Sequence, residues 1–233
     1  MPNSDFFCRR GLFATREVFD ARACARILSE ARAADKAAAE VQRQGYSRVD
    51  GDVRRGKQAE MSAPTKACVK RGLLALKPRL EEHFKIELTD CEEPQFLSYE
   101  EGDLFQPHQD GRNDPDAPEF IKKRRVSVVV FLNGAAEDPG PDSYAGGSLT
   151  FYGLINEPGW EKYGFPLFGE PGLLVAFPSR LMHEVTPVTQ GQRYTVVSWF
   201  FSSPSWTLTV AARRAGPRDP LRGSGAMGAG SGR

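Results

Sequence analysis

Two histidines and one aspartate have the residue types and the spacing that a metal site requires. His108 and Asp110 lie two residues apart in LFQPHQDG, and on a strand this spacing places both side chains on the same face. His183 begins a second strand-like run, HEVTPV. Together they offer two imidazoles and one carboxylate. This is the donor set of the facial triad that holds non-haem Fe(II) and leaves coordination positions open for reactants.

An arginine follows the second of these histidines. Arg193 begins the strand-like run RYTVVSWFF, ten residues after His183. Its planar guanidinium can hold a carboxylate through two parallel hydrogen bonds, and an arginine buried on a strand needs such a partner. The even-numbered spacing places three further residues on the same face of the strand: Thr195, Val197 and Trp199.

The elements that position these residues are predicted to be strands. From Gln95 onward, β-prone runs alternate with clusters of Gly, Pro, Asn and Asp: QFLSY, LFQPHQD, RVSVVVFLN, GGSLTFY, GLLVAF, HEVTPV and RYTVVSWFF. Seven such runs within about 105 residues, with no helical period between them, indicate a β sandwich or barrel. We therefore expect a mainly β protein with a double-sheet core and supporting N-terminal helices.

The first third of the chain has helical patterns. Asp20 is the predicted N-cap of a helix, and Phe19 before it is placed to pack against Cys24. A second apolar stripe is formed by Val69, Leu73, Leu76, Leu80 and Phe84. Pro78 is expected to kink or split that helix. The polar stretch 44–64 between the two helices reads as a loop that could include a short strand, and residues 54–61 within it are a candidate lid. His83, among charged neighbours, is expected on the surface.

Composition excludes several classes of protein. Lys plus Arg total 31 and Asp plus Glu total 30. The net charge is therefore close to zero, which does not indicate a protein that binds nucleic acid or an anionic membrane. The run Lys122–Arg125 is interpreted as a solvated strand edge. Four scattered cysteines without a CxxC pair support neither a zinc ribbon nor a secreted disulfide framework. We expect a cytoplasmic protein that does not enter membranes.

Three regions are predicted. Residues 1–94 form a helical support region integrated with the core, and residues 95–210 form the β core. Residues 211–233 carry five Arg against one Asp among many Gly and Ala, a composition that cannot bury enough apolar surface to fold. We expect this basic tail to be disordered.

The order of the motifs resembles the Fe(II)/2-oxoglutarate-dependent dioxygenases, in particular the prolyl 4-hydroxylase-like group. The elements that match are Tyr99 in SYEEGDLF, His108 with Asp110, the Gly146-Gly147 pair in GGSLTF, and His183 with Arg193. The resemblance covers residues 95–201, just under half of the chain. It implies a double-stranded β-helix, or jelly-roll, core.

The resemblance also implies roles for individual residues. His108, Asp110 and His183 would be the iron ligands, and Arg193 would pair with the distal carboxylate of 2-oxoglutarate. Four positions match residues near the cosubstrate in relatives: Tyr99, Leu149, Val185 and Trp199. Phe131 departs from the pattern, because many relatives have a tyrosine there that helps to bind the distal carboxylate. Ser127 matches a position that is often threonine, and it is the predicted source of the missing hydroxyl.

The activity that the resemblance implies is hydroxylation of an amino-acid, peptide or protein substrate, with a prolyl residue as one candidate. Fe(II), 2-oxoglutarate and O2 would be required, with ascorbate as a further candidate cofactor, and succinate and CO2 would be released. Asp110 favours oxygen transfer, because related halogenases have a small residue at this position. Two alternatives remain: a non-catalytic binding or sensor module on the same fold, and a zinc hydrolase. Strand alternation points Glu184, the nearest candidate base for a hydrolase, away from the metal.

Overall fold

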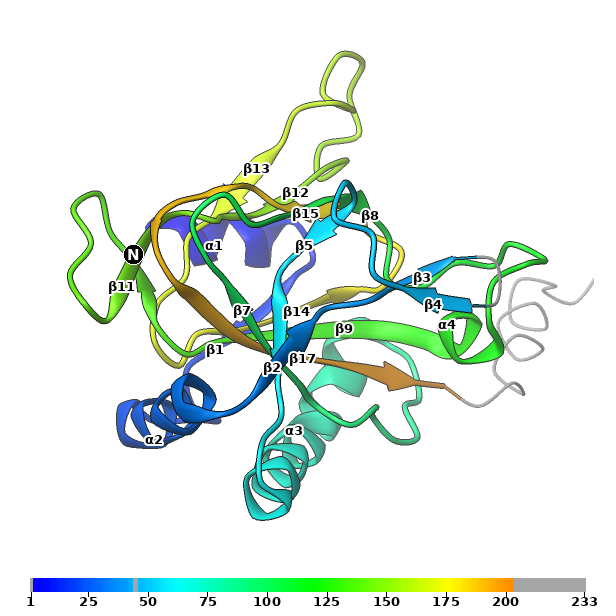
Figure 1. Ribbon diagram of the computed structural model, residues 1–233. Helices are drawn as coiled ribbons and strands as arrows, with labels where there is room; N and C mark the ends of the chain where they lie inside the picture. The colour runs from blue at the N-terminus through cyan, green and yellow to red at the C-terminus, as the bar shows by residue number, and fades with distance from the viewer. Residues whose placement is uncertain (1, 44–45, 203–233) are drawn as a thin grey trace, which may run out of the picture. The chain divides into compact units, whose positions relative to one another are not determined.

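The computed structural model describes residues 2–43 and 46–202, so the predicted basic tail lies outside the described residues. Two large sheets account for most of its strands (Figure 1). The seven-stranded sheet has the order β1 (Phe13–Thr15), β14 (Leu174–Pro178), β9 (Arg124–Phe131), β17 (Arg193–Phe201), β7 (Gln95–Tyr99), β6 (Lys57–Ala59) and β2 (Lys36–Ala38). The five-stranded sheet has the order β13 (Phe165–Leu167), β12 (Leu149–Phe151), β15 (His183–Val185), β8 (Leu104–His108) and β5 (Arg54–Arg55).

Two smaller sheets complete the strands that the structure describes. One contains β10 (Gly134–Ala135), β11 (Ser143–Gly146) and β16 (Val188–Gly191), and the other is the hairpin of β3 (Val41–Arg43) and β4 (Tyr46–Arg48). The strand pairs are antiparallel except for β10 with β11. Each of the seven predicted β-prone runs contains a strand, which confirms the prediction of a mainly β core.

The two large sheets face each other across an apolar core. Side chains from β9 and β14 of the larger sheet pack against side chains from β12 and β13 of the smaller one: Val129, Phe131, Val175, Phe177, Leu149, Phe151 and Leu167. Intervening β9 residues such as Val128 and Val130 point to the opposite face, as strand alternation requires. The larger sheet is therefore buried on both faces, and most residues of its strands β9, β14 and β17 are buried.

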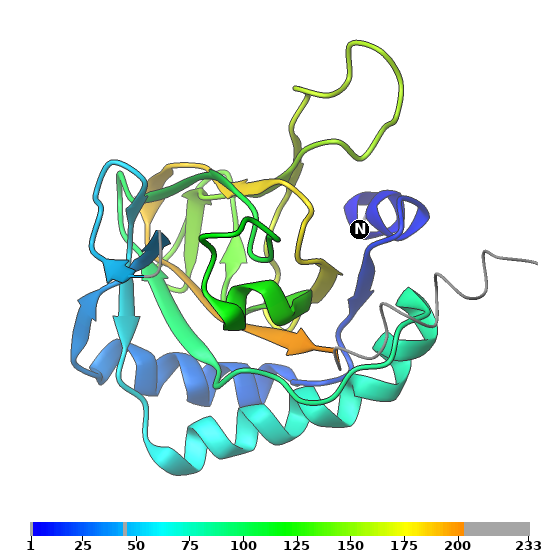
Figure 2. The ribbon, with the colours of Figure 1, turned by 90° about the vertical axis from the view of Figure 1, so that its right-hand side faces the viewer.

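Two long helices cover the outer face of the seven-stranded sheet, as Figures 1 and 2 both show. Helix α2 spans Ala21–Ala33, and the Asp20 carboxylate caps it by accepting a hydrogen bond of 2.7 Å from the Ala23 backbone N–H. Phe19 and Cys24 lie in the same buried cluster. The predicted cap and the predicted packing of helices on one sheet face are thereby confirmed.

Helix α3 spans Ala63–Phe84 and runs on through Pro78, so Pro78 does not split the helix. Pro78 removes one backbone hydrogen bond, but the helix is anchored on both sides of it. Leu73, Leu76 and Leu80 are at most 3% exposed, and burying each leucine contributes about 1.5–3 kcal/mol. This packing outweighs the local cost of the proline.

The segment between the helices contributes strands, which corrects the prediction of a lid over residues 54–61. Strand β5 adds to the edge of the five-stranded sheet beside β8, and β6 pairs with β7 in the seven-stranded sheet. One short helix, α1 (Pro2–Arg9), precedes β1, and another, α4 (Glu119–Lys123), precedes β9. Within the described part of the chain, no helix is long and apolar enough to cross a membrane.

Candidate metal centre and its cavity

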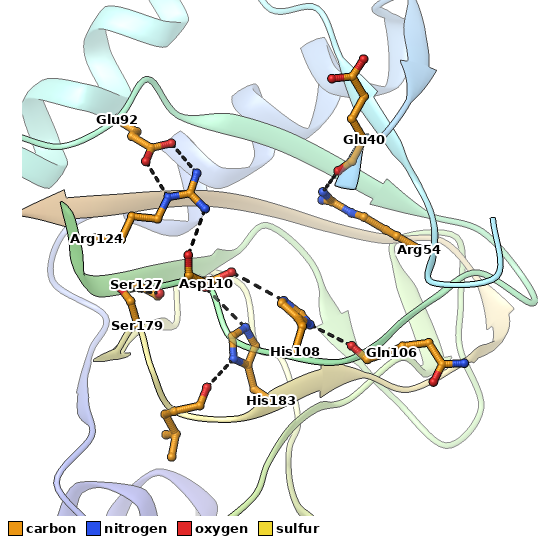
Figure 3. Close-up of polar contacts among 11 residues, drawn as sticks. Glu40, Arg54, Glu92, Gln106, His108, Asp110, Arg124, Ser127, Ser179 and His183 are labelled. Carbon is orange, nitrogen blue, oxygen red and sulfur yellow. Dashed lines mark hydrogen bonds and ion pairs between the residues drawn. The ribbon is translucent and has the colours of Figure 1, made fainter. Parts of the chain in front are cut away.

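His108, Asp110 and His183 converge at one point, where β8 and β15 lie side by side (Figure 3). The register pairs His183 directly with His108, and Asp110 follows two residues beyond the end of β8. The His108 Nε2 and His183 Nε2 atoms lie 3.5 Å and 3.4 Å from the two Asp110 carboxylate oxygens. One atom from each residue lies within 4.8 Å of the others, a separation at which all three could bind one ion.

Hydrogen bonds orient both imidazoles for metal binding. Nδ1 of His108 lies 2.8 Å from the Gln106 carbonyl oxygen, and Nδ1 of His183 lies 2.8 Å from the Leu181 carbonyl oxygen. A carbonyl only accepts, so each Nδ1 carries the proton and each Nε2 offers its lone pair to the centre. Carbonyl partners of this kind are typical of histidines that bind metals.

Electrostatics keep Asp110 and His183 in the protonation states that a metal requires. Burial, followed by the neighbouring imidazole of His108, lowers the pKa of His183 to about 4, so the ring is neutral at pH 7. Burial raises the pKa of Asp110, but His183, His108 and Arg124 together outweigh it and hold that pKa well below its usual range. The set at neutral pH is therefore a carboxylate and a neutral His183, as a divalent cation prefers.

Arg193 is buried, with 1% of its surface exposed, and lines the same cavity as the metal-ligand candidates from the opposite sheet. Its guanidinium lies over the rings of Tyr99 and Phe131, 5.4 Å and 5.2 Å from their centres. One hydrogen bond of 3.3 Å, from Nη1 to the Thr195 hydroxyl, holds it, and its Nε has no partner among the described residues. A buried cation in this state requires an anion.

The two glycines of the GGSLTF run allow the chain to pack closely beside Arg193. Gly146 and Gly147 have positive φ angles of 69° and 57°, which favour glycine. A Cβ at Gly147 would lie 3.1 Å from Cδ of Arg193 and 3.4 Å from the ring of Tyr144. Tyr144 is buried beside this site, and burial raises the pKa of its hydroxyl although Arg193 opposes the effect. The sequence gives no motif that singles out Tyr144.

A cavity of about 880 Å³ contains the triad and Arg193. The four other predicted cosubstrate neighbours line it as well: Tyr99, Leu149, Val185 and Trp199. Thr195 and Val197, predicted on the same face of β17, also line it. The structure therefore brings to one cavity the triad, the arginine and four of the five further residues that the sequence selected.

Ser127 does not occupy the position that its predicted role requires. Its hydroxyl donates to the Ser179 hydroxyl at 3.0 Å. In the register of β9 with β17, Ser127 lies opposite Trp199, whereas Phe131 lies opposite Thr195, next to Arg193. Trp199, the partner of Ser127, is six residues along β17 from Arg193, so the hydroxyl that accompanies Arg193 comes from Thr195 instead.

Arg124 is a further buried residue of the cavity that sequence reasoning missed. Its guanidinium binds the Glu92 carboxylate through two hydrogen bonds of 2.5 Å and 2.6 Å (Figure 3). It also lies 3.6 Å from the centre of the Trp199 ring. Its Nη1 also lies 3.4 Å from the Asp110 carbonyl oxygen. The interpretation of Lys122–Arg125 as a solvated edge is wrong for Arg124, because a partner 32 residues away buries it.

Two other predictions about single residues are confirmed. His83 is exposed and lies against the Gly11 carbonyl oxygen, apart from the triad. Glu184 points away from the centre and accepts a short hydrogen bond from the Tyr152 hydroxyl. This contact occupies the carboxylate that a hydrolase would need as its base.

Comparison with known proteins assigns the segment that carries the site. Residues 94–201 match the sequence model of the 2OG-Fe(II) oxygenase superfamily. The matched segment is just under half of the chain, and over this segment the chain is similar to that superfamily. PKHD-type hydroxylases align with part of the chain: one from Shewanella frigidimarina is 32% identical over 111 residues, 47% of this chain and 43% of the relative. Another, from Synechococcus elongatus, is 37% identical over 88 residues, 38% of this chain and 32% of the relative. The chain thus spans less than half the length of these curated relatives.

Solved structures share the fold of this chain. A prolyl-4-hydroxylase from Pseudomonas putida superposes with a TM-score of 0.59 at 21% identity, over 83% of this chain and 93% of its own. A prolyl hydroxylase from Trichoplax adhaerens, in complex with a peptide fragment of the hypoxia inducible factor oxygen degradation domain, superposes with a TM-score of 0.58 at 18% identity, over 86% and 87%. The predicted resemblance to the prolyl 4-hydroxylase-like group is confirmed.

Proposed function

We propose that this protein is an Fe(II)- and 2-oxoglutarate-dependent hydroxylase. The observation that carries the proposal is the presence, in one cavity, of a converging His-Asp-His set and a buried arginine without a carboxylate partner. The first feature fits a divalent metal, and the second fits a dicarboxylate that reaches from the metal to the arginine. Similarity to the oxygenase superfamily supports the same conclusion.

The residues fit these two groups in chemical terms. His108, Asp110 and His183 would hold Fe(II), and Arg193 would bind the distal carboxylate of 2-oxoglutarate with assistance from Thr195. The orphaned Nε of Arg193 supports this assignment, because a buried donor without a partner is costly unless a ligand satisfies it. Tyr99, Leu149, Val185 and Trp199 would form the wall around the cosubstrate.

Bound Fe(II) and 2-oxoglutarate supply the activation of O2, which ends in hydroxylation of a C–H bond and release of succinate and CO2. The protein positions the reactants and excludes water. Asp110 remains ionised and keeps a third protein ligand at the centre. Leu149 and Val185, at most 6% exposed, keep an apolar wall beside the reacting groups.

The substrate is proposed to be an amino acid, a peptide or a protein side chain. The two solved prolyl hydroxylases with this fold make a prolyl residue one candidate. We also propose that the facing sheets form the double-stranded β-helix of the superfamily, that ascorbate supports turnover, and that the protein works in the cytoplasm. The four cysteines support the last point, because all of them are free thiols.

Conversion of 2-oxoglutarate to succinate tests the activity. Purified chain with added Fe(II) is expected to form succinate in the presence of O2, slowly even without a substrate, and the Asp110→Ala variant is expected to lose this turnover. Succinate formation that is absent in the wild-type chain, or equal in Asp110→Ala, would show that the triad is not an oxygenase centre.

A further inference from the structure

Three buried arginines line the cavity, and only two of them have an assigned anion. Arg54, Arg124 and Arg193 are 8%, 7% and 1% exposed. Glu92 neutralises Arg124 through two hydrogen bonds. Under the proposed function, Arg193 takes the distal carboxylate of 2-oxoglutarate while the keto-acid end binds the metal, so both anionic ends of the cosubstrate are occupied. Arg54 has no counter-ion among the residues that the structure describes.

The surroundings of Arg54 are those of a ligand-binding group. One of its nitrogens, Nη1, donates to the Glu40 backbone carbonyl oxygen at 2.9 Å, and its Nε is buried without a hydrogen-bond partner. Among the residues that the structure describes, no carboxylate forms an ion pair with it, and Figure 3 shows the Glu40 carboxylate turned away from the guanidinium. A buried guanidinium of this kind is unfavourable unless an anion pairs with it.

Arg54 also lies close to the metal-ligand candidates. It is on β5 opposite Phe105 of β8, and its guanidinium lies 4.8 Å from the centre of the Phe105 ring. The Phe105 ring in turn stacks on the His108 imidazole, with 3.5 Å between the ring centres. The Phe105 ring therefore lies between Arg54 and the metal ligand His108, and an anion bound by Arg54 would lie close to the metal centre. Arg54 and Arg124 lie on different sides of the metal centre (Figure 3).

We propose that Arg54 binds a carboxylate group of the hydroxylated substrate, so that the substrate is an acid. This inference rests on the proposed function and restricts its substrates to compounds that carry a carboxylate group. A guanidinium holds a carboxylate through two parallel hydrogen bonds, and the free Nε can supply one of them. A free amino acid or another small acid has the required group, as does a peptide with an acidic side chain or a C-terminal carboxylate.

Blocking carboxylates in a mixture of candidate substrates provides the test. A lysate of the source cells is separated into a small-molecule fraction and a peptide fraction, and half of each is methyl-esterified. All four samples are incubated with the wild-type chain, Fe(II), 2-oxoglutarate and O2, and mass spectrometry detects compounds that gain one oxygen atom relative to Asp110→Ala. We expect hydroxylated products from one untreated fraction and an amount at least 10-fold smaller from its esterified half. The fraction that gives products shows whether the substrate is a small molecule or a peptide.

Binding of the compound so isolated then tests Arg54 itself. Calorimetry compares the acid with its methyl ester on three metal-free proteins: wild type, Arg54→Gln and Arg55→Gln. Arg55 is the matched control, because it is the exposed neighbour on the same strand. Wild type and Arg55→Gln are expected to bind the acid about 10- to 100-fold more tightly than the ester, and Arg54→Gln is expected to bind both alike. Arg54→Lys should restore part of the preference.

The outcomes separate this inference from the proposed function. In a preparation that forms succinate, equal products from esterified and untreated fractions, or no product in either, would overturn the carboxylate assignment. A preparation that forms no succinate would instead contradict the proposed function. A purely structural role for Arg54 predicts that Arg54→Gln weakens acid and ester by the same factor, which would also overturn it. The comparison of acid with ester on the wild-type chain requires no variant and holds even if Arg54→Gln fails to fold.

Discussion

Arg124 and Arg193 are both buried in the wall of one cavity, yet their surroundings differ. Arg124 has a complete set of partners: two hydrogen bonds to Glu92, the face of Trp199, and the carbonyl of Asp110. Arg193 has two aromatic rings, one hydroxyl and an orphaned Nε. Glu92 neutralises Arg124, whereas Arg193 has no anionic partner among the described residues and can bind an anionic ligand.

The difference separates structural charges from functional ones. A paired buried cation stabilises the local fold once its partner is present, and breaking the pair is costly. An unpaired one lowers the stability of the free protein and recovers that cost when the ligand binds. Arg54 resembles Arg193 in this respect. Removing Glu92, the partner of Arg124, should therefore lower the stability of the fold. Changing Arg193 should instead weaken the binding of its ligand.

The largest effect is expected from Arg193→Gln on cosubstrate binding. Loss of a buried, charge-paired hydrogen-bond donor costs about 2–5 kcal/mol, so the Kd for 2-oxoglutarate should rise by about 30-fold or more. Anaerobic calorimetry on the Fe(II)-loaded chain measures this. The matched control is Arg79→Gln, whose guanidinium pairs with Glu17 on the surface and which should leave the Kd unchanged. A Kd in Arg193→Gln within 3-fold of wild type would remove Arg193 from the cosubstrate site.

Glu92→Gln should give the opposite result, a loss of stability. The change leaves the buried Arg124 guanidinium without its counter-ion. Because the Glu92 side chain is 18% exposed, we expect about 2–3 kcal/mol, below the full cost of a buried pair, and a fall in Tm of about 4–12 °C. Glu93→Gln is the control: Glu93 pairs with Lys70 at the surface and is 68% exposed, so its Tm should move by no more than about 2 °C. Equal shifts in the two variants would mean that the Arg124 pair is not structural.

The smallest effect is expected from Thr195→Val. This variant keeps the shape of the side chain and removes the one hydroxyl bonded to Arg193. A hydrogen bond of this kind contributes about 0.5–1.5 kcal/mol, so the Kd for 2-oxoglutarate should rise about 2- to 10-fold. Ser127→Ala provides the contrast, because Ser127 bonds Ser179 at a distance from the arginine. A larger effect from Ser127→Ala than from Thr195→Val would contradict the observed register.

The features that the sequence could predict depend on local spacing. His108 and Asp110 converge because a strand places alternate residues on one face, and Asp20 caps α2 through a contact three residues away. The features that it could not predict depend on pairing between distant segments. Arg124 is buried by Glu92, and the position of Ser127 follows from the register of β9 against β17. Pro78 is tolerated because tertiary packing holds α3 on both sides of it.

Anaerobic titration of Fe(II) into the purified, metal-free chain tests the central claim most directly. The wild-type chain is expected to bind one Fe(II) per molecule, because the two Nε2 atoms and the Asp110 carboxylate converge on one point. Asp110→Ala and His183→Ala should lose this binding, while His83→Ala, which changes the one histidine outside the triad, should retain it. No stoichiometric binding by the wild-type chain, or equal binding by Asp110→Ala, would contradict the assignment of the metal centre.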